Sequence, residues 1–178
     1  MTTPTFYIFS GLPGSGKSTL AQALAKQTGA IYLRIDTVEQ ALRDLCQLKV
    51  EGEGYRLSYR IASDNLKLGL NVIADCCNPI QLTRDEWQSV ANRAGADYIN
   101  IEIACSHREE HQQRIETRLN PIANLILPTW QQVVERHYES WSNTAESSNV
   151  VHIDTAGQSI EASSAALFHQ LKLAQQPN

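Results

Sequence analysis

Short apolar runs alternate with amphipathic stretches along this chain, and the alternation predicts a regular succession of strands and helices. Runs typical of buried strands lie at 5–10, 30–34, 71–75, 98–104 and 150–153. Between them, apolar residues recur at helical spacing over 16–27, 84–94, 129–141 and 159–174, and in the segments that follow residues 36, 54 and 106. This order predicts an α/β fold, in which a five-stranded parallel sheet is flanked by helices on both faces.

Several residue types indicate where helices begin and where the chain turns. Asp36 or Thr37 can cap the helix after the second strand, and Ser106–Glu109 has the spacing of a capping box. The polar stretch Glu51–Gly54 predicts a turn between two helices, and Asn120–Pro128 has no periodicity and predicts an irregular segment. No repeat, linker or low-complexity segment interrupts the 178 residues, so we expect a single domain over 1–178.

Composition and charge narrow the range of partners. The formal net charge is −4, and the 15 Lys and Arg residues form no long basic run, which argues against an extended nucleic-acid surface. No apolar run approaches membrane-spanning length and the first residues do not resemble a signal segment, so we expect no membrane association and a cytoplasmic location. The four cysteines include no C-x-x-C pair, which predicts reduced thiols and no cysteine metal site. A monomer and a homodimer are both compatible with the sequence.

The most specific motif lies between the first predicted strand and its helix, where residues 11–18 match G-x-x-x-x-G-K-[ST]. The residues predicted to surround the phosphates are Gly11, Leu12, Pro13, Gly14, Ser15, Gly16, Lys17, Ser18 and Thr19. Glycines allow the backbone N–H groups to wrap around an anion at the positive end of the helix. Lys17 can then reach the β- and γ-phosphates and Ser18 can ligate Mg²⁺, so the motif predicts a nucleoside triphosphate site.

Two carboxylates follow predicted strands, and in a parallel α/β sheet the ligand binds beyond the carboxyl ends of the strands. Asp36 follows the second strand and is suited to orient an acceptor hydroxyl and take its proton, although a role as helix cap is also open. Asp75 closes the third strand, where it can hold Mg²⁺ or contact the acceptor, or be an ordinary turn residue.

Arg114 and Arg118 lie four residues apart on a predicted helix and would share one of its faces. Two guanidinium groups placed just before the irregular segment can close over a nucleotide, one on the base and one on phosphate, and so exclude water. The alternative is a solvated helix face on which Glu110 pairs with Arg114 and Arg118 is free in solvent. Spacing alone favours this alternative.

Taken together, the chain resembles the compact P-loop kinases, above all the predicted kinases related to the zeta-toxin and polynucleotide kinases, and more distantly adenylylsulfate and gluconate kinases. The matching segments are Gly11–Thr19, Leu33–Asp36, Val72–Asp75 and His111-x-x-Arg114-x-x-x-Arg118, followed by Leu127–Trp130 with Tyr138 and Trp141. The resemblance implies an AAA family ATPase-like P-loop NTPase three-layer sandwich with a small helical lid at approximately 108–128.

By the same resemblance, Lys17, Ser18 and Thr19 would bind ATP and Mg²⁺, Asp36 would be the catalytic base, and Arg114 and Arg118 would be lid arginines. One departure concerns the arginine that polynucleotide kinases carry shortly after the base, because here Thr37-Val38-Glu39 follows Asp36.

The function that these residues favour is transfer of the γ-phosphate of ATP to a hydroxyl of a small-molecule acceptor, whose identity the sequence does not reveal. Two alternatives remain open. One is a kinase acting on a polynucleotide 5′-hydroxyl, which would need a basic groove beside Asp36. The other is a protein that binds and slowly hydrolyses ATP as a switch and acts through a partner.

Overall fold

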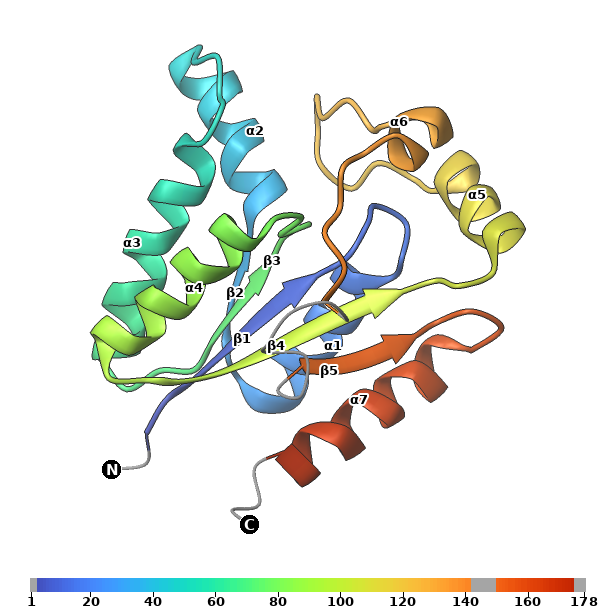
Figure 1. Cartoon of the computed structure of the whole chain (residues 1–178). Coiled ribbons are helices and arrows are strands. Elements are labelled where there is room, and N and C mark those ends of the chain that lie inside the picture. Colours follow the sequence, from blue (N-terminus) through green and yellow to red (C-terminus); the bar gives the residue numbers. More distant parts are fainter. Residues whose placement is uncertain (1–2, 142–149, 175–178) are drawn as a thin grey trace.

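The computed structural model of the chain describes residues 3–141 and 150–174 (Figure 1). The strands are β1 (Thr5–Ser10), β2 (Ile31–Arg34), β3 (Val72–Asp75), β4 (Asp97–Ala104) and β5 (Val150–Asp154). The helices are α1 (Lys17–Thr28), α2 (Ile35–Cys46), α3 (Glu53–Lys67), α4 (Gln81–Ala94), α5 (Arg108–Thr117), α6 (Trp130–Val134) and α7 (Ile160–Ala174). The strands therefore begin and end within one residue of the positions that their apolar runs predict.

The strands form one parallel sheet in the order β2-β3-β1-β4-β5. The central strand β1 pairs with β3 on one side and with β4 on the other, so that Phe6 stands opposite both Val72 and Tyr98. Because the strands are parallel, all their carboxyl ends lie at the same edge of the sheet. The segments that follow the five strands meet there.

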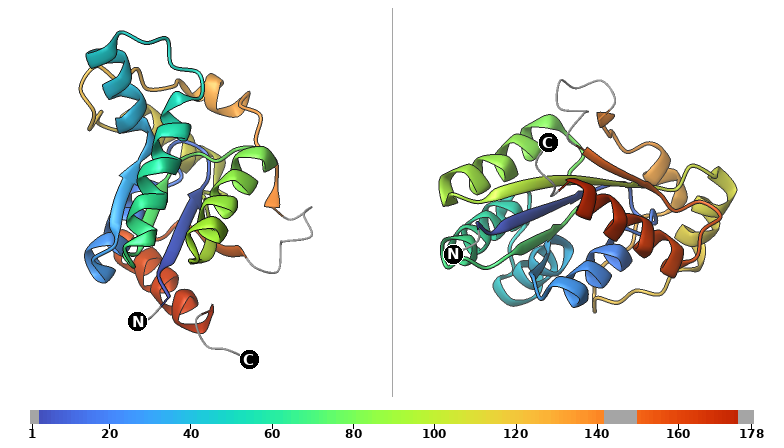
Figure 2. Two further views of the ribbon diagram at one scale, coloured as in Figure 1. Left: turned by 90° about the vertical axis from the view of Figure 1, so that its left-hand side faces the viewer. Right: turned by 90° about the horizontal axis from the view of Figure 1, so that it is seen from below.

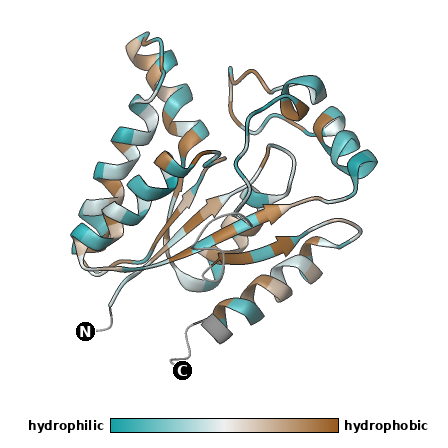
Figure 3. Cartoon of the chain, viewed as in Figure 1, coloured by the Kyte–Doolittle hydropathy of each residue, from teal (hydrophilic) through white to brown (hydrophobic). Residues whose placement is uncertain are grey.

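Alternate side chains of β1 enter two separate cores, one on each face of the sheet. Tyr7 and Phe9 pack with apolar residues of α1 and α7, whereas Phe6 and Ile8 pack with those of α3 and α4. Figure 2 shows helices on both sides of the sheet, and Figure 3 shows apolar residues concentrated in the strands between them. The predicted three-layer α/β fold is confirmed.

Trp87 organises the core between the sheet and helices α3 and α4. Its fully buried ring meets the edge of Phe6 at a centroid distance of 5.4 Å and the ring of Tyr59 at 4.4 Å. Edge-to-face aromatic pairs contribute about 0.5–1.5 kcal/mol beyond the area that they bury. These contacts fix α3 against the sheet and leave Tyr59 half-buried.

Helix α2 begins earlier than predicted, which corrects the expectation that Asp36 or Thr37 caps it. The helix starts at Ile35, and the residue at its N-cap position is Arg34, the last residue of β2, whose backbone is extended. Ile35 is buried in the core, and strand and helix are joined without a loop because this apolar residue packs inward at the junction. Asp36 consequently lies in the first turn of the helix, where a carboxylate interacts favourably with the helix dipole.

Three helix boundaries near the sheet edge also differ from prediction. Helix α3 begins at Glu53, inside the stretch expected to be a turn. The N-cap of α5 is His107 instead of Ser106, because the His107 ring accepts the N–H of Glu110 at 3.3 Å. Thr129 is the N-cap residue of α6 and forms a capping box, but the helix ends at Val134 and does not continue to Trp141. The stretch 120–128 has no regular secondary structure, as predicted.

None of the helices in the described part of the chain combines the length and the apolar character needed to cross a membrane.

Candidate active site

The loop between β1 and α1 is held open by its backbone conformation. Gly11, Gly14 and Gly16 have φ angles of 140°, 80° and 95°, which favour glycine. Gly16 is the N-cap residue of α1 and no side chain caps the helix, so the first N–H groups of α1 are free to meet an anion. In the same loop the buried Ser15 hydroxyl has no hydrogen-bond partner among the described residues. A loop of this shape fits the phosphates of a nucleotide.

Neighbouring elements leave no room for side chains at two of these glycines. A Cβ at Gly11 would lie 2.2 Å from the carbonyl oxygen of Ile103 on β4, and a Cβ at Gly14 would lie 2.6 Å from Cδ1 of Ile115 on α5. The first contact is with backbone, which cannot move aside without disturbing the sheet. The loop is therefore shaped by β4 and α5 as well as by its own sequence.

We expect Gly11→Ala to destabilise the protein by about 3 kcal/mol or more, since it combines an unfavourable φ with a clash against backbone. The matched control is Gly29→Ala, at a position with φ 71° and open space around the new Cβ, which should cost only about 1–2 kcal/mol. Chemical denaturation of the two variants measures the difference. Equal losses of stability would show that the approach of Ile103 does not constrain the loop.

A cavity of about 900 Å³ opens between this loop and segment 114–128, and its walls are strongly basic. The basic residues that line it are Lys17, Arg34, Arg43, Arg114, Arg118 and Arg136, and the acidic ones are Asp36 and Glu39. An excess of positive side chains around a glycine-rich loop matches the charge of a triphosphate. Ser18 and Thr19 also line the cavity, at the start of α1.

Lys17 lies at the inner wall of this cavity and is only 7% exposed. Burial by itself lowers the pKa of its ammonium group, but the neighbouring Cys77, Asp75 and Asp36 raise the pKa by more, so that the net pKa is above its ordinary value. The ammonium group therefore stays protonated at neutral pH. It supplies a fixed positive charge where the sequence predicts the β- and γ-phosphates.

The two carboxylates singled out in the sequence occupy different positions. Asp36 is half-buried, lines the cavity, and forms no ion pair with any described residue. Asp75 is buried behind the cavity wall, where it accepts a 2.6 Å hydrogen bond from the Tyr32 hydroxyl and lies 4.0 Å from Nε of Arg34. Its second oxygen has no hydrogen-bond partner in the described structure. Asp36 can thus contact a substrate in the cavity directly. Asp75 can influence a bound substrate only through Lys17 or through a bound water.

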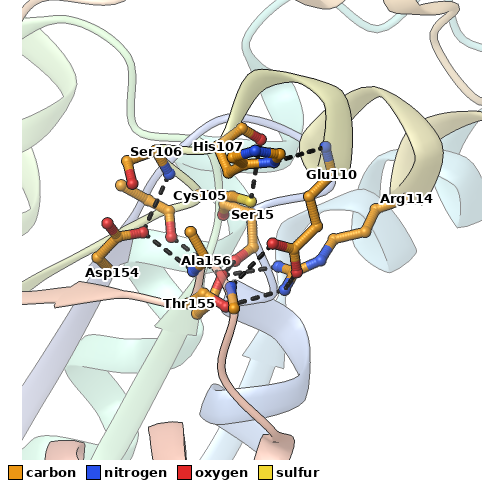
Figure 4. Close-up of polar contacts among 11 residues, drawn as sticks. Ser15, Cys105, Ser106, His107, Glu110, Arg114, Asp154, Thr155 and Ala156 are labelled. Atoms are coloured by element: carbon orange, nitrogen blue, oxygen red, sulfur yellow. Dashed lines mark hydrogen bonds and ion pairs between the residues drawn. The ribbon is translucent and has the colours of Figure 1, made fainter.

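Arg114 is fixed by a network that joins α5 to the turn between β5 and α7 (Figure 4). Its guanidinium donates to the Thr155 hydroxyl at 2.7 Å, to the Thr155 carbonyl at 2.9 Å and to Glu110 at 2.6 Å. The pKa of the Glu110 carboxyl is lowered by the backbone N–H of Gly157, which it accepts at 2.8 Å, and further by Arg114. The Glu110–Arg114 pair expected for a solvated helix face is present, but Arg114 also lines the cavity.

Arg118 does not share a helix face with Arg114, which corrects the sequence-based expectation. Helix α5 ends at Thr117, and Arg118 has an extended backbone with φ −63° and ψ 141°. Its side chain donates to the Pro128 carbonyl at 3.2 Å and lines the cavity, so it is not free in solvent either. Burial lowers the pKa of its guanidinium below the ordinary value, although Asp36 and Cys77 act in the opposite direction. Both arginines reach the cavity, but from a helix and from the loop that follows it.

Two side chains for which the sequence predicted no contact also shape the site. Thr155 is buried, and its hydroxyl lies 2.8 Å from the Ser15 carbonyl, which ties the turn after β5 to the Gly11–Ser18 loop. His111 on α5 is buried and donates from Nε2 to the Pro13 carbonyl at 2.7 Å, since a carbonyl oxygen can only accept. These contacts span 140 and 98 residues of sequence, and no local pattern predicts them.

We expect Thr155→Val to lower stability by about 1–3 kcal/mol, because it leaves the Arg114 guanidinium and the Ser15 carbonyl without a shared partner. It should also weaken binding of a nucleotide, since Arg114 would lose one of the three hydrogen bonds that hold it beside the cavity. The control is Thr117→Val on exposed α5 surface. Thermal unfolding with and without ADP and Mg²⁺ measures both effects. Indistinguishable behaviour of the two variants would rule out a role for the Arg114–Thr155 contact.

Together, the parallel sheet with one glycine-rich loop, the buried lysine and the basic cavity define a P-loop protein of kinase-like fold. The sequence model of the AAA_33 family, described as an AAA domain, matches residues 7–139. The chain therefore belongs to this family. Among its relatives, the adenylyl-sulfate kinase of Oceanobacillus iheyensis is 29% identical over 176 residues, an alignment that covers 92% of this chain and 82% of the relative.

Three solved structures illustrate the shared fold. A gluconokinase from Sinorhizobium meliloti 1021 superposes with a TM-score of 0.66 at 18% identity, covering 98% of this chain and 96% of that one. The Mycobacterium tuberculosis APS kinase CysC, solved with AMPPNP and APS, gives 0.69 at 16% identity with coverage of 97% and 99%. Chaetomium thermophilum Kti12, solved with ADP-AlF3, gives 0.70 at 19% identity with coverage of 97% and 100%. The expected similarity to adenylylsulfate and gluconate kinases is thereby confirmed at the level of fold.

Proposed function

We propose that this protein is an ATP-dependent kinase that transfers the γ-phosphate of ATP to a hydroxyl group of a small molecule. The observation that carries the proposal is the position of Asp36. Its carboxylate faces the basic cavity beside Lys17 and also lines a second cavity of about 660 Å³. A carboxylate between a triphosphate site and a second binding space is where a kinase needs its base.

The residues around the first cavity supply distinct parts of such a reaction. The N–H groups of the Gly11–Ser18 loop would hold the phosphates, and Lys17 would neutralise charge on the β- and γ-phosphates. The Ser18 hydroxyl, and Asp75 through water, would hold Mg²⁺, which when bound neutralises phosphate charge. Arg114 and Arg118 would contact the nucleotide from a lid formed by residues 108–128. The adenylyl-sulfate kinase relationship supports this assignment.

In the proposed step, the acceptor oxygen forms a bond to the γ-phosphorus while the bond from that phosphorus to the β,γ-bridging oxygen breaks. Asp36 takes the hydroxyl proton and later releases it to solvent. ADP leaves with the electron pair of the broken bond, so the transfer is balanced without a further reactant. Closure of the lid would keep water from competing with the acceptor.

The direct test is a screen of hydroxyl compounds for acceptor-dependent ADP release, followed by phosphorus NMR of the product. We expect at least one class of alcohol to raise ADP release well above basal hydrolysis and to yield a phosphate monoester. Hydrolysis that no alcohol stimulates would contradict the kinase proposal. It would favour the alternative of a nucleotide-dependent switch. Stimulation by an oligonucleotide alone would favour the polynucleotide 5′-hydroxyl kinase.

Four sequence-based expectations remain part of this proposal. The chain would act as a single domain in the cytoplasm, as a monomer or a homodimer, and its nearest kin would be the zeta-toxin and polynucleotide kinase group. The net charge of −4 supports a small acceptor over a polynucleotide, whereas the basic cavity beside Asp36 is compatible with either acceptor.

A further inference from the structure

A second cavity adjoins the first, on the far side of Asp36 from the Gly11–Ser18 loop. It lies between the start of α2, the start of α3 and the stretch that joins β3 to α4. The two cavities share the side chains of Asp36, Glu39, Cys77 and Arg136. A hydroxyl group beside Asp36 would therefore face the triphosphate site, and the rest of the same molecule would extend into the second cavity.

The inner wall of the second cavity is aromatic and apolar. Tyr55 and Tyr59 line it from one face of α3, together with Ile35, Pro79, Ile80 and Leu82. Burial raises the pKa of both phenols above the ordinary value, so both rings remain neutral at physiological pH. Tyr59 is held by its contact with Trp87, and the Tyr55 hydroxyl accepts the backbone N–H of Asn78 at 3.4 Å. Rigid, neutral rings of this kind bind a flat apolar body.

The charge of the second cavity is opposite to that of the first. Its carboxylates are Asp36, Glu39, Glu51 and Glu86, and its guanidinium groups are Arg56 and Arg136.

Several of these charges are already compensated: Glu39 pairs with Arg43, Glu51 with Lys49, and Arg56 with Glu53. Among the described residues that line this cavity, Asp36, Glu86 and Arg136 form no ion pair, which leaves two carboxylates and one guanidinium. The potential left over is therefore negative, which disfavours an anionic ligand.

We propose that the second cavity binds the non-reacting part of the acceptor, and that this acceptor is a ring-bearing alcohol that is neutral or positively charged. The inference rests on the proposed kinase function and adds the substrate class to it. An acceptor with a carboxylate or phosphate at its far end would place that charge beside Glu86, whereas Arg136, the lining guanidinium without an ion pair among the described residues, lies where the two cavities meet. The cavity therefore selects against the anionic acceptors that a basic pocket would favour.

A matched series of three alcohols tests this inference: para-(aminomethyl)benzyl alcohol, para-methylbenzyl alcohol and para-(hydroxymethyl)benzoate. They share one ring and one hydroxymethyl group and differ in charge at the far end. Binding is measured by ligand-observed NMR in the presence of ADP and Mg²⁺. We expect the cation to bind most tightly and the anion about tenfold more weakly, as expected for a small excess of negative charge near the surface. Tightest binding of the anion, or binding of none of the three, would overturn the inference.

Two pairs of variants assign the effect to this cavity. Glu86→Lys should narrow or reverse the preference for the cation. Asp85→Lys makes the same charge change at the preceding residue of α4 and should leave the preference unchanged. Tyr59→Leu should weaken binding of all three alcohols by about threefold to tenfold, because it removes the ring contact. Phe168→Leu, which removes a ring on the opposite face of the sheet, should leave binding of the three alcohols unchanged. Equal effects within either pair would overturn the assignment to the second cavity.

A nucleotide titration on the same samples separates this inference from the function on which it rests. If ADP and Mg²⁺ bind and an anionic alcohol is phosphorylated when ATP replaces ADP, the kinase function stands and the substrate class is wrong. If the nucleotide does not bind, the proposed function fails first.

Discussion

Lys17→Ala is expected to lower acceptor phosphorylation by about a thousandfold, the scale on which loss of a charge that stabilises the transition state reduces the rate. Lys17 is buried at the base of the loop, and Asp36, Asp75 and Cys77 keep its ammonium group charged. No other ammonium group lines the first cavity in the described structure. Binding of ATP and Mg²⁺, measured by calorimetry, should weaken together with the rate.

The control for this experiment is Lys26→Ala, which removes a lysine from the exposed last turn of the same helix. Lys17→Met keeps most of the buried side chain and separates loss of charge from loss of packing. We expect Lys17→Met to unfold at a temperature close to that of the parent and still to be inactive. An active Lys17→Met variant, or undiminished binding of ATP and Mg²⁺, would refute the assignment of the Gly11–Ser18 loop as the nucleotide site.

Asp36→Asn is expected to reduce the turnover of the identified acceptor by about a hundredfold to ten-thousandfold, the range that a positioned general base contributes. The amide keeps the size of the side chain but cannot take the hydroxyl proton. Because the N-cap residue of α2 is Arg34, the substitution should leave the helix and its stability nearly unchanged. Binding of ATP should be retained, since Asp36 is not part of the Gly11–Ser18 loop.

Asp64→Asn on the exposed surface of α3 makes the same chemical change away from both cavities. Parent-like turnover by this control, combined with loss of turnover by Asp36→Asn, would assign the base. If Asp36→Asn keeps full turnover, the base is another group. If it instead loses ATP binding, Asp36 supports the nucleotide site and not the acceptor.

The strands were predictable from the sequence because each is a short apolar run, and burial of such runs on both faces is what a parallel sheet requires. The helix ends were less predictable. His107 replaces Ser106 as the N-cap of α5 because its ring nitrogen reaches the N–H of Glu110, a choice between adjacent residues that composition does not determine. Likewise, the periodic apolar residues after Thr129 predicted a helix to Trp141, but tertiary contacts override them. The Glu139 N–H is bonded to the Pro79 carbonyl instead of to its own segment.

The residues of the site likewise differ in how far the sequence predicts them. The Gly11–Ser18 loop could be predicted because its glycine spacing is local, and Asp36 because it directly follows a strand. The contact of Arg114 with Thr155 could not, since Thr155 is 41 residues away and follows a different strand. The second cavity was also beyond sequence reasoning, because Tyr59 and Glu86 come together only after α3 and α4 pack side by side. Chemistry encoded in one segment was predictable, and chemistry assembled from several segments was not.

The opposite charge of the two adjoining cavities has a consequence for product release. On the proposed reaction, a phosphoryl group moves from a compartment lined mainly by arginines to one in which carboxylates prevail. The acceptor enters without this charge and leaves with about two additional negative charges. Repulsion from Glu86, and from the Asp36 carboxylate once it has released its proton, would then favour departure of the phosphorylated product. Such an arrangement would make product inhibition weak.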